Sequence, residues 1–403
     1  MSGAATPPTP RPAPPAPPPR RAWHPERLGS ALLLSALVAF LALGQAGHLG
    51  RSLKLLADDL RNDGPNAADS GHLTRDYYRG LLGDAGGVSK GIPERLSRWL
   101  LGLGHAAEVR SDTFATSPIG RAGAGFPLRE LAPSTSAELA GALVTVNSHG
   151  MRDEECALEA PAGALRLAMI GASNDMGWGV RHEEAWATQL EALLASTRGT
   201  PVEVLNFAVP SFTLLEQLWS VEARIARFAP RLLLFTVTLP ELRNELIGRL
   251  ATRVRSGRDL GFEFVRKIVA ESGAKPGDDI DVALRKLRPF TEALVDGVFA
   301  ELTRIGRTTG LPIAVVVLKL EPGDAVARQL RWAADAAERA GLPVVRAFDA
   351  CRELSAIELY VDARSDHHPG VVAHAALAAE IAAALDAQPA LRAALGKAAL
   401  PTD

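Results

Sequence analysis

The chain has 403 residues, enough for one large domain or two smaller ones. Hydrophobic residues make up 47% of it, which can fill a sizeable core, and a net charge of −2 excludes the electrostatic footprint of a nucleic-acid-binding protein. The two cysteines, Cys156 and Cys351, exclude a disulfide framework and a cysteine-based zinc site. They could form one bridge in an oxidising compartment, but two separate buried thiols are the favoured interpretation.

The amino-terminal region divides into a proline-rich segment and an apolar one. We expect residues 1–27 to form a disordered cytoplasmic tail, because so many prolines and so few large apolar residues cannot build a core. Residues 28–47 carry no charge and are about long enough to cross a membrane, and the arginines before them favour a cytoplasmic amino terminus. We therefore expect a single-pass signal anchor with the rest of the chain outside the cytoplasm, periplasmic or at the cell surface. The alternative is a cleaved signal peptide, with Gly44-Gln-Ala46 as the cleavage site.

Residues 48–142 alternate short helical patterns with glycine-rich breaks, and we expect a stalk and a helical extension there. Residues 143–152 alternate like a strand and then turn, and after them strands and helices alternate regularly. The expected strands are 165–170, 202–209, 231–239, 312–320 and 343–348, and the expected helices are 183–196, 214–228, 324–340 and 370–385. This rhythm predicts an α/β domain over 143–388, with a parallel sheet covered by helices on both faces and a tail over 389–403. A helical insert, 241–307, with one polar break around residues 273–281, follows the third strand, and we expect it to shape the substrate cleft.

The stretch from Leu165 to Val180 suggests a functional site. An apolar strand ends at Gly171, a turn of small residues presents Ser173, and a helical pattern follows after two more glycines. This order places a serine at the carboxyl edge of a parallel sheet, where ligands bind in open α/β folds. The alternative is an ordinary turn in which Ser173 only caps a helix.

Candidate partners for this serine occur near the other end of the chain. Asp366 and His368 lie on a polar loop just before the last predicted helix. A histidine there could take the serine proton while the carboxylate holds the imidazole in the accepting tautomer. The alternative is that Asp366 caps the last helix and that His367, His368 and His374 are solvated or structural. The adjacent histidines do not indicate a metal site, because acidic and soft ligands do not cluster around them.

Taken in order, these residues resemble the SGNH/GDSL hydrolases, a flavodoxin-like group of esterases, lipases and acyl-transfer enzymes. The resemblance points in particular to a membrane-anchored branch of bacterial envelope proteins linked with polysaccharide O-acylation. It covers residues 143 to about 385 and rests on several short blocks that occur in the family's order. The blocks are Asn147–Arg152, Gly171–Ser173 with Gly177 and Gly179 after it, Asn206–Pro210, Ala229–Pro230, and Asp366–Pro369 with His374 after it.

The resemblance implies that Ser173 is the nucleophile, His368 the general base and Asp366 its orienting carboxylate. It also implies an oxyanion hole made of the backbone N–H groups of Ser173 and of the turn near Ser211, a turn that follows Asn206. The chain departs from the family pattern at several positions, of which Ser211 and the end of the third strand concern the oxyanion hole. Ala172 replaces the usual aspartate, Ser211 replaces a glycine, and no asparagine ends the third strand, so that Asn174 or Asn244 would have to substitute for it.

Residues and resemblance together predict a membrane-anchored, extracytoplasmic serine esterase or O-acyltransferase of flavodoxin-like three-layer fold. Its substrate would be an acylated small molecule or glycan, and neither a cofactor nor a metal nor nucleic acid is expected. The envelope polysaccharide-modification machinery is a further expected partner. The missing asparagine at the end of the third strand favours the alternative, a catalytically inactive SGNH-like binding or scaffold protein in envelope polysaccharide assembly.

Overall fold

The computed structural model describes residue 114 and the ranges 117–123, 125–242, 244–321, 323–363 and 366–396. The expected cytoplasmic tail, the signal anchor over 28–47 and most of the stalk lie outside these residues. Among the residues described, no single helix is long and apolar enough to cross a membrane. The helices α15 (Val371–Ala387) and α16 (Pro389–Leu395) reach that length and hydropathy only as a pair bent by 96°.

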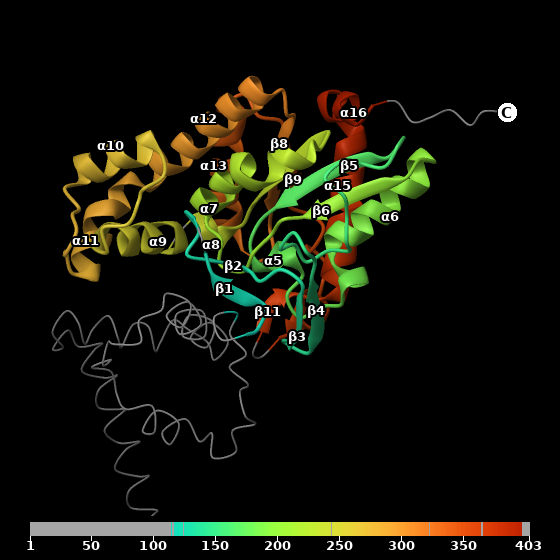
Figure 1. Ribbon diagram of the computed structural model, residues 1–403, viewed down its shortest axis with the longest axis horizontal. Coiled ribbons are helices and arrows are strands. Elements are labelled where there is room, and N and C mark those ends of the chain that lie inside the picture. The colour runs from blue at the N-terminus through green and yellow to red at the C-terminus, as the bar shows by residue number, and fades with distance from the viewer. Residues whose placement is uncertain are drawn as a thin grey trace, which may run out of the picture. The chain divides into compact units, whose positions relative to one another are not determined.

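A five-stranded parallel sheet forms the centre of the molecule, in the order β6-β5-β7-β8-β9 (Figure 1). Every residue of β5, β7 and β8 is buried, because helices cover both faces of the sheet and leave no polar side to the strands. The order matches the flavodoxin-like arrangement and confirms the predicted parallel sheet. The strands are β5 (Leu165–Ile170), β6 (Val202–Asn206), β7 (Leu232–Val237), β8 (Ile313–Leu318) and β9 (Val344–Ala347).

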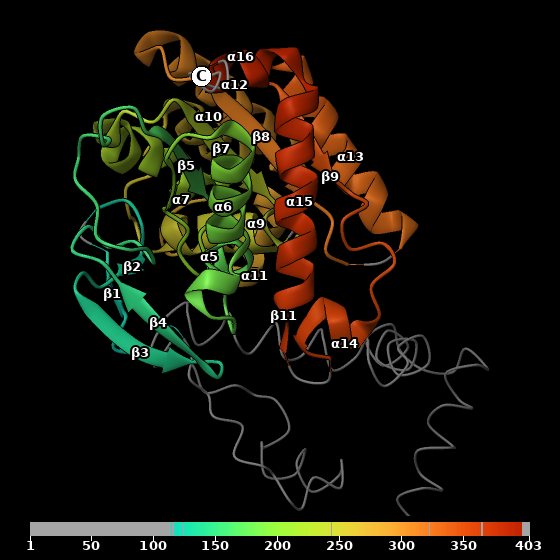
Figure 2. The same cartoon turned by 90° about the vertical axis from the view of Figure 1, so that its right-hand side faces the viewer.

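Two layers of helices enclose this sheet. The helices α6 (Trp186–Arg198) and α15 pack side by side on one face, as Figure 2 shows. The other face carries α7 (Leu214–Ser220), α12 (Thr291–Thr309) and α13 (Asp324–Arg339). The three-layer prediction is therefore confirmed for the described residues.

Only the last part of the expected stalk and helical extension, 48–142, lies among the described residues, and strands rather than helices occur there. That part forms two antiparallel ribbons, β1 (Gly120–Ala122) with β2 (Arg129–Leu131) and β3 (Thr135–Leu139) with β4 (Ala142–Val146). The second ribbon turns through Ala140 and Gly141, both at positive φ, the geometry of a two-residue hairpin loop. Buried and exposed residues alternate along β4, so one side of the ribbon faces the core. The α/β domain therefore begins before residue 143.

The helical insert is interrupted twice rather than once. The predicted polar break is present between α10 (Glu263–Ser272) and α11 (Ile280–Leu287), where Asp279 caps α11 by accepting the N–H of Asp281. A second break, not predicted, separates α9 (Asn244–Arg255) from α10, because Gly257 and Gly261 adopt positive φ there. The insert is also shorter than 241–307, since α12 belongs to the helix layer between β7 and β8.

Two further expectations need correction. Residues 389–395 are not a tail: they form α16, whose Leu391 and Leu395 are buried one helical turn apart. The two thiols are separate, as favoured, but only Cys351 is buried and Cys156 is half-buried. Burial raises the pKa of Cys351 to about 11, so this thiol stays protonated at neutral pH.

The edge strand β6 is covered by carboxylates. Asp153 Oδ2 accepts the N–H of Asn206 at 2.9 Å, and Glu191 Oε2 accepts the N–H of Val204 at 2.9 Å. These bonds satisfy donors that an edge strand otherwise exposes. Burial raises the pKa of Asp153 to about 7, well above the ordinary range of an aspartate.

We expect the folded protein to be more stable at pH 6 than at pH 8, because the native state takes up a proton at Asp153 near pH 7 and the unfolded chain does so only near pH 4. The native state therefore binds more protons between these pH values, and this group raises the free energy of unfolding by roughly 1 kcal/mol as the pH falls from 8 to 6. Thermal unfolding of the full-length protein and of Asp153→Asn at both pH values measures the effect. An equal pH dependence in the two proteins would contradict it.

Candidate active site

Ser173 lies three residues beyond the end of β5, at the carboxyl edge of the sheet. It opens the short helix α5 (Ser173–Met176), and its side chain is buried. Ala172 is the N-cap residue, and the Asp175 carboxylate reaches back to accept the Ala172 N–H at 3.0 Å. A Cβ at Gly171 would lie 2.0 Å from Asp175 Oδ2, so only glycine fits before the turn. Ser173 is therefore not the helix cap, and the alternative interpretation of this turn is wrong.

The base and the acid come from a third small antiparallel ribbon rather than from the predicted loop. The strand β10 (Tyr360–Asp362) pairs antiparallel with β11 (Asp366–Pro369), which carries both side chains. His368 Nε2 lies 2.9 Å from Ser173 Oγ, and His368 Nδ1 lies 2.5 Å from Asp366 Oδ1. With its Nδ1–H donated to the carboxylate, the imidazole presents Nε2 as an acceptor to the Ser173 hydroxyl. The N-cap residue of α15 is Gly370, so Asp366 does not cap this helix.

Asp366 is held as a carboxylate. Burial alone would raise its pKa, but hydrogen bonds from His368 and Trp178 bring the pKa below its ordinary value. The Trp178 indole donates Nε1–H to Asp366 Oδ2 at 3.0 Å, and its ring stacks on His368 with centroids 5.2 Å apart. The sequence prediction did not include Trp178. Its place between Gly177 and Gly179, just after the serine turn, was the available signal.

Arg152 organises the loop that follows α5. Its guanidinium, almost fully buried, donates to the carbonyl of Met176 at 3.0 Å and also to those of Gly177 and Val180. Burial lowers the pKa of Arg152 to about 10, which leaves it charged at neutral pH. A buried cation that binds three carbonyls holds this loop in one shape. The sequence prediction placed Arg152 in a motif block but assigned it no role.

Ser211 occupies the turn after β6 in a conformation that favours glycine. Its φ is 67°, and its side chain is buried. Arg249, from α9 of the insert, donates to the Ser211 carbonyl at 2.8 Å. A backbone held at positive φ in a buried turn is a strained feature that often accompanies function. The insert thus contacts the turn predicted to supply an oxyanion donor.

The three asparagines predicted for the site have different surroundings. Asn206 donates to the carbonyl of Asp175 at 3.3 Å and accepts the N–H of Ala208 at 3.0 Å, so its amide braces α5 against the end of β6. Asn174 is half-buried in α5, next to the serine. Asn244 opens α9, and its side chain lies outside the described part of the structure. Of the three, Asn174 is the one that directly adjoins Ser173.

Buried titratable groups surround the serine turn. Burial raises the pKa of Asp175 to about 7, and burial together with the charge of Asp175 raises the pKa of Glu241 well above its ordinary value. Burial lowers the pKa of His374 to about 3, and its Nδ1 accepts the N–H of Trp186 at 3.2 Å. His374 is therefore a neutral, structural histidine that supports the start of α6. Among the described residues, no group of three potential ligands could hold a metal ion.

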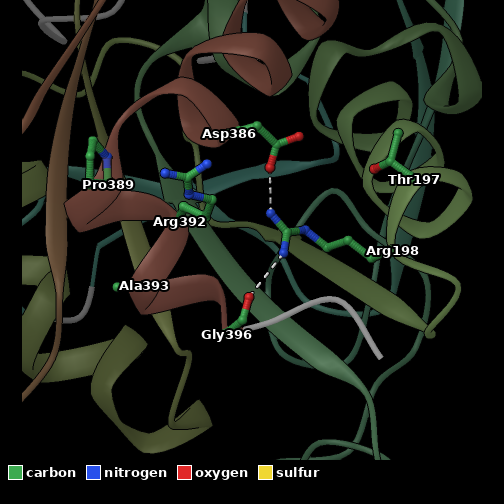
Figure 3. Close-up of a pocket in the computed structure, with 7 residues that line it drawn as sticks. All are labelled: Thr197, Arg198, Asp386, Pro389, Arg392, Ala393 and Gly396. Atoms are coloured by element: carbon green, nitrogen blue, oxygen red, sulfur yellow. Dashed lines mark hydrogen bonds and ion pairs between the residues drawn. The ribbon is translucent and has the colours of Figure 1, made fainter. Parts of the chain in front are cut away.

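A hollow of about 690 Å³ lies between α6, α15 and α16 (Figure 3). Arg198 spans it, pairing with Asp386 at 2.6 Å and donating to the Gly396 carbonyl at 3.3 Å. Because Arg198 ends α6 just before β6 begins, the hollow lies at the amino edge of the sheet, opposite Ser173. Its lining residues are Thr197, Arg198, Asp386, Pro389, Arg392, Ala393 and Gly396.

No protein-family model matches the chain, and no curated protein matches it. Solved structures with some similarity include TesA (16% identity, TM-score 0.37), which covers 55% of this chain and 98% of its own. A lipase/acylhydrolase from Enterococcus faecalis has 12% identity and a TM-score of 0.35, with 55% and 96% covered. A catalytic mutant of the acetylxylan esterase Axe2 from Geobacillus stearothermophilus has 15% identity and a TM-score of 0.35, with 55% and 94% covered. Similarity this low carries no functional argument, so function rests on the geometry around Ser173.

We expect Gly179→Ala to destabilise the protein more than Gly163→Ala. Both glycines have positive φ, which costs an alanine about 1 kcal/mol, but a Cβ at Gly179 would also lie 2.8 Å from the Val361 methyl groups. A Cβ at Gly163 would have no atom within 4 Å, so Gly163→Ala measures the cost of the positive φ alone. Displacing Val361 should therefore lower the free energy of unfolding of Gly179→Ala by roughly 1–3 kcal/mol more than that of Gly163→Ala. Urea unfolding of both variants measures the difference, and equal losses would show that the loop does not press against β10.

Proposed function

We propose that the protein is a serine ester hydrolase or O-acyltransferase of SGNH type, with Ser173, His368 and Asp366 as its catalytic residues. The observation that carries this proposal is the contact of 2.9 Å between His368 Nε2 and Ser173 Oγ, with Asp366 on the opposite ring nitrogen. These three side chains come from two segments nearly 200 residues apart and meet at the carboxyl edge of the sheet. A nucleophile, a base in reach of it and a carboxylate that orients the base are the parts that acyl transfer needs.

The proposed reaction has two halves. Ser173 Oγ attacks the ester carbonyl while His368 Nε2 takes the hydroxyl proton, and collapse of the tetrahedral intermediate releases the alcohol, which receives that proton from His368. The acyl group is then bound to Ser173 as an ester. Water or a second hydroxyl attacks this acyl-enzyme with His368 again acting as the base, and the choice of acceptor separates hydrolysis from transfer.

The oxyanion hole is proposed to use backbone donors. The N–H of Ser173 lies in the first turn of α5, where helix N–H groups have no intrahelical acceptor. The N–H of Ser211 is the second proposed donor, on a turn that Arg249 supports from α9. The Asn174 side chain, adjoining the serine, is the proposed third donor. One such donor contributes about 3 kcal/mol to transition-state stabilisation.

The finer features of the proposal follow from the sequence. The substrate is proposed to be an acylated compound of carbohydrate type, handled together with envelope polysaccharide-modification machinery. Residues 28–47 are proposed to anchor the chain, which places the domain outside the cytoplasm. The segment after β7 favours the alternative, an inactive scaffold protein. Between β7 and α9 this segment contains the buried Glu241 but no asparagine that could donate to the oxyanion.

We expect a fluorophosphonate probe to label the full-length protein at Ser173, because such probes react with an activated serine hydroxyl. Ser173→Ala should lose the adduct, and His368→Ala should slow labelling by at least about 10²-fold, since the base then cannot take the proton. His367→Ala is the matched control: this neighbouring histidine is exposed and should leave the labelling rate near that of the wild type. A folded wild-type protein without a Ser173-dependent adduct would favour the scaffold alternative.

We expect the full-length protein to remain in the membrane fraction after a wash at high pH, because residues 28–47 provide a span of 20 uncharged and mostly apolar residues. Replacing residues 1–47 by a cleavable secretion signal should move the protein to the soluble extracytoplasmic fraction. The control replaces residues 1–27 only and should stay with the membrane. Release of the full-length protein by the wash would overturn the anchor.

A further inference from the structure

We propose that Trp178 is a positioning residue that keeps Asp366 and His368 aligned with Ser173, a role that rests on the proposed function. The two oxygens of the Asp366 carboxylate have separate partners: Oδ1 faces His368 Nδ1 at 2.5 Å, and Oδ2 accepts the Trp178 indole N–H at 3.0 Å. Rotation of the carboxylate would break both contacts together. The indole therefore sets the direction from which Asp366 meets the imidazole, and a buried bond to an ionised acceptor is of the stronger kind.

The same side chain also contacts the base. The rings of Trp178 and His368 are stacked, with an angle of 26° between their planes and 5.2 Å between their centroids. The face of an indole attracts cations, so the stack favours the imidazolium that forms when Ser173 gives up its proton. Trp178 is 4% exposed, which leaves it almost no surface for a substrate. It acts through Asp366 and His368.

The backbone of Trp178 is tied to the nucleophile. Its N–H donates to the Ser173 carbonyl at 3.2 Å, while Arg152 binds the carbonyls on both sides of it, at Gly177 and Val180. The adjoining Gly179 lies so close to Val361 of β10 that no Cβ fits between them. Trp178 thus connects the serine turn to the β10–β11 ribbon. Its backbone binds Ser173, and its indole binds Asp366 of β11. A shift of the ribbon relative to Ser173 would have to break these contacts.

Three variants separate the hydrogen bond from the ring contact. Trp178→Phe keeps an aromatic face and loses the N–H donor, and Trp178→Leu loses both. Trp332→Phe is the matched control, a half-buried tryptophan on α13 in the outer helix layer. The substrate is p-nitrophenyl acetate and the protein is the full chain in detergent. We expect kcat to fall roughly 10-fold in Trp178→Phe and roughly 100-fold in Trp178→Leu, with KM within about twofold of the wild type, because a lost charged hydrogen bond acts on the proton transfer and not on binding.

Proton NMR gives a second readout that does not depend on turnover. The His368 Nδ1–H that faces Asp366 should give a far-downfield signal, assigned by its absence in Asp366→Asn. We expect Trp178→Phe to shift or broaden this signal and Trp332→Phe to leave it unchanged. An unchanged signal together with wild-type kcat in Trp178→Phe overturns the inference, as does a general loss of folded structure by circular dichroism in both Trp178 variants. A perturbed signal in a protein whose wild type neither turns over ester nor takes the fluorophosphonate supports the positioning role and rejects the proposed function.

Discussion

The contact between Ser173 Oγ and His368 Nε2 joins two parts of the chain that are 195 residues apart in sequence. It exists only because the parallel sheet brings the end of β5 and the approach to α15 to the same edge. In a parallel sheet all carboxyl ends lie together, so groups that follow different strands can meet without any local relation in sequence. The remaining features of the site keep these two segments at hydrogen-bond distance.

Much of this support is polar and buried. Arg152 binds the carbonyls after α5, Asp175 closes the serine turn, Asn206 braces that turn against β6, and His374 supports α6. A buried polar group is costly unless it is bonded, which makes such contacts specific: a displaced partner leaves a charge or a donor without compensation. The core beneath the site therefore tolerates few arrangements, and the serine turn has little freedom to move.

The buried carboxyl groups carry a second consequence. Asp153 and Asp175 have pKa values of about 7, raised chiefly by burial, so their protonation changes in the range where the proposed base must be neutral to accept a proton. His374, with its pKa lowered to about 3, stays neutral throughout that range. Burial thus keeps these carboxyl groups partly protonated near pH 7, so they carry less negative charge than two exposed aspartates would.

Patterns of hydrophobicity alone predicted the five strands of the sheet and the main helices, because a strand buried on both faces is a short apolar run between polar turns. They also indicated Ser173, His368 and Asp366, since each lies in a polar or small-residue turn next to an apolar element. Alternation also predicted the strand that begins at residue 143, which is β4, because buried and exposed residues alternate along it. Its partner β3 and the strands β1, β2, β10 and β11 escaped prediction, and four of these five have only three or four residues, too few for a clear alternation. Trp178 escaped it because its place between two glycines marks a tight turn but does not show that the indole reaches Asp366, 188 residues away in sequence.

The amino-acid pattern is enough to place the strands of the central sheet along the chain and to name the groups that can act as nucleophile, base and acid. Which of these groups meet depends on the folded arrangement, because distance across a sheet edge depends on strand order and packing rather than on sequence separation. The folded arrangement placed Asn206 in a supporting contact, it put Ser211 at positive φ under Arg249, and it set the Trp178 indole against both Asp366 and His368. The local sequence pattern shows the type of each residue and the element it lies in, whereas the contacts on which function depends form between residues that are far apart in sequence.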